Sequence, residues 1–299
     1  MKEKYSGIIP PLATPLLDQQ TVDPAGTSRL LRHVLDGGVH GLFILGTTGE
    51  APSLSYRLRY QLMEQVIGEV DRQVPVLVGV TDSSLEEALT FSQKAQQLGA
   101  DALVVASPYY YPAGQDSLIS FVHQLLEVTE IPLFLYNIPS HSPHVFSQES
   151  ILQLLDHPQV AGYKDSTGSM MGFDRLNMHF SAYSDKSYLL GPEELLAESV
   201  LLGADGGVNG GANFFPRLYV KLYEAAKAGN LELIRKLHQR VMEVSHHLYQ
   251  DGKTVIQGVK YGLSYQGICQ ETLALPLAPL SEKEKTSMHT FLENFDTDF

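Results

Sequence analysis

Residues 160–168 read Val-Ala-Gly-Tyr-Lys-Asp-Ser-Thr-Gly, a short apolar run that reaches one lysine, Lys164, and then breaks into a polar loop. The pattern predicts a buried β-strand that carries Lys164 to its C-terminal end. Burial penalises the charged ammonium and lowers the pKa of a lysine. A neutral lysine amine is a nucleophile that forms an imine with a carbonyl substrate. The alternative is a snorkelling strand-end lysine that is paired with Asp165.

This stretch is one of eight apolar runs that alternate with amphipathic helical segments. The predicted strands span residues 8–15, 41–45, 76–80, 102–106, 133–137, 160–164, 188–191 and 205–208. Strands that are apolar almost throughout indicate a parallel sheet buried on both faces. Eight strand–helix units predict an α/β protein with a closed (β/α)8 barrel, the TIM-barrel architecture.

The chain changes character at Phe215, after which we find only helical patterns. They cover residues 215–227, 231–250, 253–265 and 282–294. The sequence therefore predicts two parts. Residues 1–214 form the barrel, and residues 215–299 form a helical C-terminal extension packed on it.

Composition narrows the classes of partner. The chain has 299 residues, 43% of them hydrophobic, and a net charge of −13. An acidic surface repels phosphate backbones, so we expect no nucleic-acid partner. We find no apolar run long enough to cross a membrane and no signal-peptide pattern at the N-terminus, and the single cysteine, Cys269, excludes an internal disulfide. A cytoplasmic protein with small-molecule partners is the simplest interpretation.

In a (β/α)8 barrel, chemistry takes place at the C-terminal ends of the strands. Hydroxyls, carboxylates and one lysine gather there in this chain: Thr47, Thr48, Glu50, Tyr109, Tyr110, Tyr136, Asn137, Lys164, Gly191, Glu193, Glu194, Val208 and Asn209. This set contains no group of metal ligands. We therefore expect neither a metal nor an organic cofactor, and a covalent imine on Lys164 instead.

Schiff-base chemistry gives these residues separate roles. Lys164 forms the imine, and the turn at Thr47–Thr48 offers backbone N–H groups and hydroxyls for the carboxylate of a 2-keto acid. Proton transfers need a hydroxyl near the imine, for which Tyr136, Thr47 and Tyr110 are candidates. The structural alternatives are an ordinary turn, a core tyrosine with a satisfied hydroxyl, and an interface patch around Tyr110.

Four motifs resemble the dihydrodipicolinate synthase/N-acetylneuraminate lyase family, in order and spacing, from about Ile8 to Phe299. They are Gly-Thr-Thr-Gly-Glu at 46–50, Tyr-Asn-Ile-Pro at 136–139, Lys-Asp-Ser-Thr-Gly at 164–168 and Gly-Ala-Asp-Gly-Gly at 203–207. The resemblance implies a pyruvate-dependent class I aldolase on a (β/α)8 barrel with C-terminal helices. It also implies a homo-oligomer, usually a tetramer.

The same resemblance implies the roles of individual residues. The Schiff-base lysine of the family falls on Lys164, its catalytic tyrosine on Tyr136, and its pyruvate-carboxylate loop on Thr47–Thr48. A tyrosine that the synthase branch lends across a dimer interface matches Tyr110. The strand-eight carbonyl near bound pyruvate matches Val208.

One position departs from the synthase branch and another resembles the lyase branch. His141 stands where the synthases have an arginine that holds the aldehyde's carboxylate, and a neutral histidine lacks its permanent charge. Gly191-Pro192-Glu193-Glu194 is similar to the lyase sequence that contacts sugar hydroxyls, for which carboxylates are natural acceptors. Alternatively, Glu193 and Glu194 serve a helix N-terminus.

We therefore predict an aldolase that cleaves or forms a 2-keto-3-deoxy sugar acid or a sialic-acid-type substrate, with pyruvate and an aldehyde as its partners. Its predicted catalytic residues are Lys164, Tyr136, Thr47 and Tyr110, and its predicted binding residues are Thr48, Val208, Gly191, Glu193, Glu194 and His141. The alternatives are 4-hydroxy-tetrahydrodipicolinate synthase, a decarboxylating dehydratase, and a barrel that binds keto acids without turnover.

Overall fold

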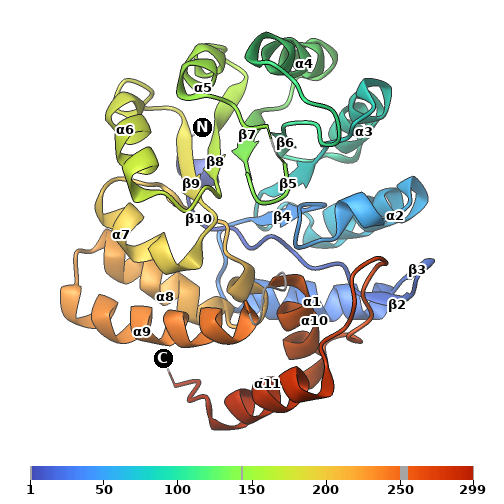
Figure 1. The fold of residues 1–299 in the computed structure, drawn as a ribbon, viewed down its shortest axis with the longest axis vertical. Helices are drawn as coiled ribbons and strands as arrows, with labels where there is room; N and C mark the ends of the chain where they lie inside the picture. The colour runs from blue at the N-terminus through green and yellow to red at the C-terminus, as the bar shows by residue number, and fades with distance from the viewer. Residues whose placement is uncertain (1, 143, 250–254, 299) are drawn as a thin grey trace.

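The computed structural model describes residues 2–142, 144–249 and 255–298. Its main feature is an eight-stranded parallel sheet with the order β1-β10-β9-β8-β7-β6-β5-β4 (Figure 1). The strands are β1 (Gly7–Ile8), β4 (Leu42–Ile44), β5 (Val76–Gly79), β6 (Ala102–Ala106), β7 (Leu133–Asn137), β8 (Val160–Asp165), β9 (Ser187–Leu190) and β10 (Gly206–Gly207). A parallel bridge between Pro11 and Phe43 joins the two edges. The predicted barrel is confirmed.

A helix follows each barrel strand before the next begins. These helices are α1 (Pro24–Asp36), α2 (Tyr56–Val70), α3 (Leu85–Leu98), α4 (Gln115–Val128), α5 (Gln148–Leu155), α6 (Met170–Phe180), α7 (Leu196–Leu201) and α8 (Pro216–Lys227). Several begin at a residue whose side chain accepts a hydrogen bond from the first turn, as Asp23 does from Gly26. These caps are readable in the sequence, and the helix starts that it predicts at residues 23–24, 55, 84, 147 and 169 agree with the structure to within a residue.

Two predicted elements differ from the structure. The first strand was predicted over residues 8–15, but only Gly7–Ile8 and the single bridge at Pro11 pair with neighbours. The prolines of this segment lack an N–H and cannot extend the ladder. The segment continues into a small antiparallel hairpin, β2 (Leu16–Asp18) and β3 (Thr21–Val22). The sequence pattern also predicts a helix over residues 192–202, but this segment begins as a 3₁₀ turn, η3 (Glu193–Leu195), before α7.

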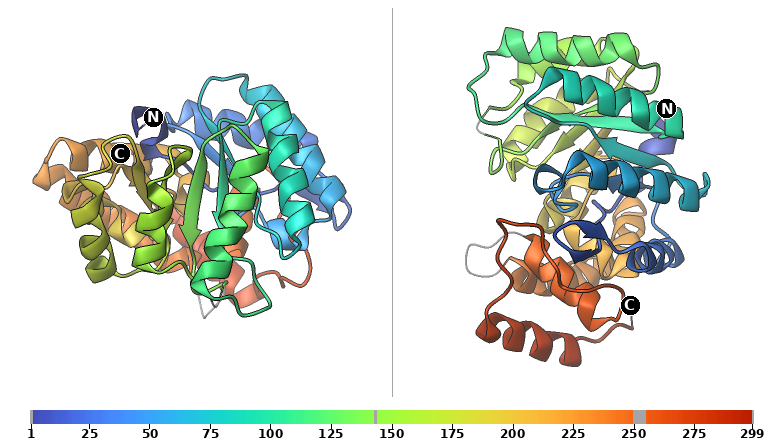
Figure 2. Two further views of the ribbon diagram at one scale, coloured as in Figure 1. Left: turned by 90° about the horizontal axis from the view of Figure 1, so that it is seen from above. Right: turned by 90° about the vertical axis from the view of Figure 1, so that its right-hand side faces the viewer.

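The C-terminal helices α9 (Leu231–Leu248), α10 (Val255–Tyr265) and α11 (Glu282–Asn294) lie on one side of the barrel (Figures 1 and 2). Helix α8 follows the predicted boundary at 214/215, yet it packs on α7 and β1 as the eighth barrel helix. The division of the chain at this point stays a prediction. Residues 250, 253 and 254 of the predicted helices lie outside the described residues. None of the described helices has the length and apolarity to cross a membrane.

The core has two layers because the strands are buried on both faces. The outer layer lies between sheet and helices. The inner layer fills the barrel and consists of Tyr5, Ile9, Phe43, Leu77, Ala102, Val104, Ala106, Phe134, Tyr136, Ala161, Leu189 and Val208. Tyr5, in the 3₁₀ turn η1 (Lys2–Tyr5), packs edge-on against Phe134 and donates a hydrogen bond to the Asp101 carbonyl at 2.6 Å. The inner layer is apolar, so Lys164 at its top is an exception that needs an explanation.

Candidate active site

Lys164 occupies the inner face of β8, between Tyr136 of β7 and Leu189 of β9. Its Nζ lies 3.9 Å from the ring centroid of Tyr136 and 4.8 Å from that of Phe43. The residue is 5% exposed. Burial away from water lowers the pKa of Lys164 from 10.5 to about 7. A large fraction of this amine is therefore neutral and nucleophilic at neutral pH.

Asp165 does not pair with Lys164, because successive side chains of a strand point to opposite faces. Its carboxylate accepts hydrogen bonds from the Tyr188 hydroxyl at 2.9 Å and from the Thr167 backbone N–H at 2.8 Å. The alternative of a solvent-seeking lysine paired with its sequence neighbour is wrong. Lys164 instead points into the barrel from an apolar floor.

Tyr136 supplies a hydroxyl beside the lysine. Ser166 donates a hydrogen bond to this hydroxyl at 3.4 Å, and Thr47 hydrogen-bonds it as well. Burial raises the pKa of Tyr136 to about 12, against the opposing effect of these two hydrogen bonds. The phenol is therefore protonated at neutral pH and belongs to a chain of three hydroxyls. Such a chain can give and take a proton at an atom bound to Lys164.

A cavity of about 540 Å³ opens above Lys164, a volume typical of small-molecule sites. It brings together eight of the predicted site residues: Lys164, Tyr136, Thr47, Thr48, Gly191, Glu194, Val208 and His141. A Cβ at Gly191 would lie 2.0 Å from the Ser166 Oγ, so a larger residue there would displace the hydroxyl that bonds Tyr136. The strand ends thus converge as the barrel topology predicts.

The structure places two predicted residues outside this cavity. Glu193 is fully buried, and its carboxylate accepts hydrogen bonds from the Gly211 N–H at 3.0 Å and from the Tyr219 hydroxyl. Burial raises the pKa of Glu193 to about 7. Tyr110 is 81% exposed, has a backbone φ of 91° and packs edge-on against Tyr111. Within one chain, neither side chain reaches Lys164.

Two polar groups line the cavity away from the lysine. Glu194 lines the cavity and accepts a hydrogen bond from Ser245 of α9 through Oε1, and no described residue donates a hydrogen bond to its second oxygen. His141 shares a 2.8 Å hydrogen bond between its Nδ1 and the Ser140 Oγ. Burial lowers the pKa of His141, so the imidazole is neutral at pH 7. In the outer part of the site, Glu194 therefore supplies a carboxylate, and His141 supplies no positive charge at pH 7.

Sequence reasoning missed three residues that shape the site. Ser166 was part of a recognised motif but had no role, and its position two residues after Lys164 was the signal that it lies nearby. Phe43 lies under the lysine as part of the inner core. Tyr249 lines the cavity from the end of α9, which no local pattern indicates.

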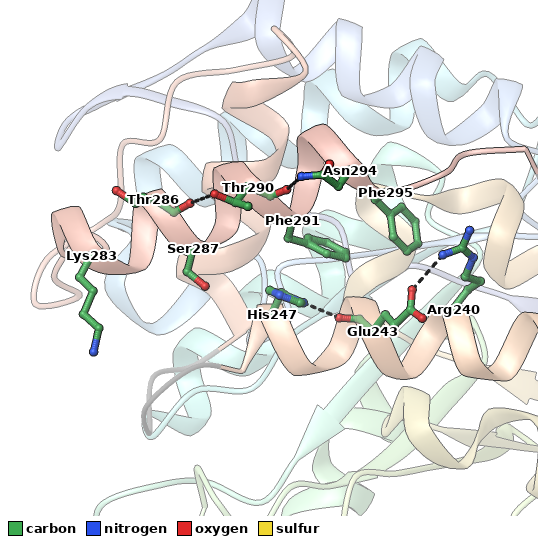
Figure 3. Close-up of a pocket in the computed structure, with 10 residues that line it drawn as sticks. All are labelled: Arg240, Glu243, His247, Lys283, Thr286, Ser287, Thr290, Phe291, Asn294 and Phe295. Atoms are coloured by element: carbon green, nitrogen blue, oxygen red, sulfur yellow. Dashed lines mark hydrogen bonds and ion pairs between the residues drawn. The ribbon is translucent and has the colours of Figure 1, made fainter.

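Two other cavities can be compared with the one above Lys164. One of about 260 Å³ is mostly apolar and adjoins the first, sharing Thr47, Tyr136, Ile138 and His141 with it. The other, about 620 Å³, is an open hollow between α9 and α11 lined by residues such as Arg240, His247 and Phe291 (Figure 3). It contains none of the predicted site residues. Within the described ranges, no group of three or more His, Cys, Asp or Glu is arranged to hold a metal ion.

Comparison with known proteins agrees with this geometry. The chain is 32% identical over 294 residues to the probable 2-dehydro-3-deoxy-D-pentonate aldolase YjhH of Escherichia coli K12, with 97% of each chain covered. A solved dihydrodipicolinate synthase from Bacteroides thetaiotaomicron is 44% identical, with 97% and 98% covered and a TM-score of 0.93. YagE of E. coli K12, solved in complex with pyruvate, is 30% identical, with 97% and 98% covered and a TM-score of 0.92.

The family profile covers nearly the whole chain. It is described as the dihydrodipicolinate synthetase family and matches residues 4–295. The match includes the strand that carries Lys164, the turn at Thr47–Thr48 and the C-terminal helices. The chain belongs to the dihydrodipicolinate synthetase family and is a Schiff-base-forming carbon–carbon lyase.

Proposed function

We propose that this protein cleaves or forms a 2-keto-3-deoxy sugar acid through an imine between pyruvate and Lys164. The observation that carries the proposal is the buried Lys164 amine, with a pKa of about 7, at the floor of a cavity that also holds Tyr136. An apolar barrel has no structural need for a lysine in this position. A Schiff-base enzyme needs a neutral amine there.

The proposed steps assign each atom transfer to a residue. Neutral Lys164 attacks C2 of the keto acid, and the hydroxyl network of Tyr136, Thr47 and Ser166 supplies the protons that convert the carbinolamine to an iminium and water. In cleavage, the network removes the proton of the C4 hydroxyl. The C3–C4 bond breaks, its electrons move into the enamine, and the aldehyde leaves. C3 is then protonated, and water hydrolyses the iminium to release pyruvate and the free amine.

The remaining residues hold the substrate. The turn at Thr47–Thr48 faces the cavity and suits the pyruvate carboxylate, and Val208 lines the same cavity. This chemistry needs no metal or organic cofactor, because the iminium itself withdraws electrons from the breaking bond. We assign the contact with sugar hydroxyls to Glu194 alone, since Glu193 is fully buried and does not line the cavity.

The outer cavity favours a sugar acid over a carboxylated aldehyde. His141 is neutral where the synthase branch has arginine, and Glu194 would repel a second carboxylate but accept hydrogen bonds from hydroxyls. The named aldolases among the relatives support the same substrate class. The second candidate is 4-hydroxy-tetrahydrodipicolinate synthase, which the 44% identical Bacteroides structure favours.

Borohydride reduction in the presence of pyruvate tests the proposal. We expect a stable adduct on Lys164, found by peptide mass mapping and absent without pyruvate. Cleavage of 2-keto-3-deoxy sugar acids would then support the aldolase, condensation with aspartate semialdehyde the synthase, and release of CO₂ from a sugar acid a decarboxylating dehydratase. Failure of every 2-keto acid to label Lys164 would contradict the proposal and leave a non-catalytic binding barrel.

Replacing Glu194 should impair recognition of the sugar part of the substrate but not of the pyruvate part. We expect Glu194→Gln to lower kcat/KM for sugar acids roughly 10-fold, the effect of weakening a hydrogen bond to a charged acceptor. Pyruvate labelling of Lys164 should not change. The matched control is Glu198→Gln on α7, which removes a half-exposed carboxylate that pairs with His238 at 3.8 Å. Equal losses for labelling and for cleavage would show that Glu194 acts on the imine site or on folding.

We further propose a homo-oligomer, a dimer or a tetramer, in which a second copy brings Tyr110 toward the site. Tyr110 and Tyr111 are both largely exposed, and the apolar cavity beside Tyr136 offers a place for an aromatic side chain. Sedimentation velocity should show an oligomer larger than the 33.0 kDa monomer. The Tyr110→Asp variant should dissociate more readily into monomers. A monomer with full activity would exclude this role. A cytoplasmic location stays a prediction.

A further inference from the structure

The turn that faces the Lys164 cavity, residues 46–49, has left-handed backbone at both of its flanks. Leu45 has a φ of 56° and Glu50 a φ of 58°. Left-handed backbone is unusual for residues other than glycine, and a bulky leucine there is an outlier. A Cβ on Gly79 would lie 2.2 Å from the Leu45 carbonyl oxygen, so only glycine at position 79 leaves room for this carbonyl. Such conformations persist only where the surrounding structure imposes them, and they gather at functional sites.

A buried ion pair holds one end of this turn. Glu50 Oε1 lies 2.9 Å from the Lys260 Nζ, and both side chains have 0% exposure. Glu50 Oε2 accepts a hydrogen bond from the Ala274 backbone N–H at 2.6 Å. Lys260 belongs to α10 and Ala274 follows it. Two segments far along the chain therefore meet at the residue that ends the turn.

The other donors of Lys260 are also used. Its ammonium donates to the Thr272 carbonyl at 2.7 Å and to the Thr14 carbonyl. The side chain of Thr14 donates to the Gly49 carbonyl at 2.7 Å. One lysine thus fixes Glu50 directly and Gly49 through Thr14. The Lys260 ammonium is therefore surrounded by two carbonyl acceptors and by the Glu50 carboxylate, its ion-pair partner.

Stability alone is a weak explanation for this arrangement. A buried ion pair often adds little to stability compared with apolar residues of similar volume. A geometric role fits better, because the pair and its hydrogen bonds converge on the flank of a turn whose shape has to be imposed. The turn in question presents Thr47 and Thr48 to the cavity.

We propose that Lys260 is a positioning residue for pyruvate, which holds the turn at 46–49 in its binding shape through Glu50 and Thr14. The inference rests on the proposed function, in which this turn binds the pyruvate carboxylate. The C-terminal helix α10 is then part of the catalytic scaffold. Lys260 itself touches neither the cavity nor Lys164.

The test measures how borohydride labelling of Lys164 saturates with pyruvate. In Lys260→Met we expect the half-saturating pyruvate concentration to rise at least 10-fold, toward the ~100-fold that a displacement of about 1 Å costs. The labelling rate at saturation should change less, because Lys164 and Tyr136 are intact. Lys186→Met is the matched control. Lys186 is equally buried and bonds the carbonyls of His157 and Pro158, but it precedes β9 at the opposite end of the barrel.

A second variant covers the case in which Lys260→Met fails to fold. Lys260→Met/Glu50→Gln removes both charges, so no carboxylate is left buried without a partner. It should show the same rise in half-saturating pyruvate. A folded double variant with wild-type half-saturation would overturn the positioning role. Absence of labelling in the unaltered protein at any pyruvate concentration would instead overturn the proposed function, so the two failures are distinguishable.

Discussion

Replacing Lys164 with methionine should abolish pyruvate labelling and lower kcat/KM on the order of 10⁶-fold, the loss found when a covalent nucleophile is removed from an enzyme. Methionine keeps the length of the side chain and suits the apolar floor formed by Phe43 and Tyr136. It offers no amine. The substrate carbonyl then has no partner with which to form the iminium that withdraws electrons from the breaking bond.

The control for this variant is again Lys186→Met, which should keep wild-type kcat/KM because Lys186 bonds carbonyls before β9. Steady-state kinetics on a 2-keto-3-deoxy sugar acid that the cleavage assays identify as a substrate would provide the measurement. Activity of Lys164→Met within 100-fold of wild type would exclude imine chemistry on this residue. Such a result would move attention to the hydroxyl network of Tyr136 as the source of catalysis.

The fold was predictable because the signals that determine it are local. Apolar runs of the right length, helix caps such as Asp23 and the βα alternation all lie within short windows of sequence. Proline explains the main error, since Pro10, Pro11 and Pro15 have no N–H to donate, and the pairing expected over residues 8–15 is reduced to Gly7–Ile8 and the bridge at Pro11. The antiparallel hairpin that follows lies in the connection between β1 and α1.

The site was predictable to the extent that it follows from the (β/α)8 barrel, in which functional residues lie at the C-terminal ends of the strands. Strand ends converge on one mouth, so eight predicted residues share one cavity. The barrel topology does not predict where side chains point in the segments that follow the strands. Glu193 and Glu194 are neighbours in a 3₁₀ turn, and one of them enters the buried network while the other faces the cavity.

Contacts between distant segments were beyond sequence reasoning. Tyr249 reaches the cavity from the C-cap of α9, and Lys260 reaches Glu50 from α10. Neither residue belongs to a local motif, and each depends on how the C-terminal helices pack on the barrel. The predicted division of the chain at 214/215 therefore separates Tyr249 from barrel residues that line the same cavity.

The burial of the Lys164 amine also leads to a prediction about the stability of the fold. Lys164→Met should raise the free energy of unfolding, because the wild-type fold keeps an amine away from water. The pKa of this amine is about 7 in the fold, compared with an ordinary value of 10.5. At about 1.36 kcal/mol per pKa unit, the destabilisation has an upper limit of about 5 kcal/mol.

The pH dependence of this gain identifies its cause. Below about pH 7 the lysine is charged in both states, so the full cost of burying a cation is present. As the pH rises toward 10.5, folding releases the proton and the cost shrinks. The advantage of Lys164→Met, measured by urea unfolding, should fall from at most about 5 kcal/mol at pH 6.5 to about 1 kcal/mol at pH 9.5. An advantage independent of pH would mean that methionine stabilises the barrel by packing alone, and that the Lys164 amine is not held in the state that nucleophilic attack requires.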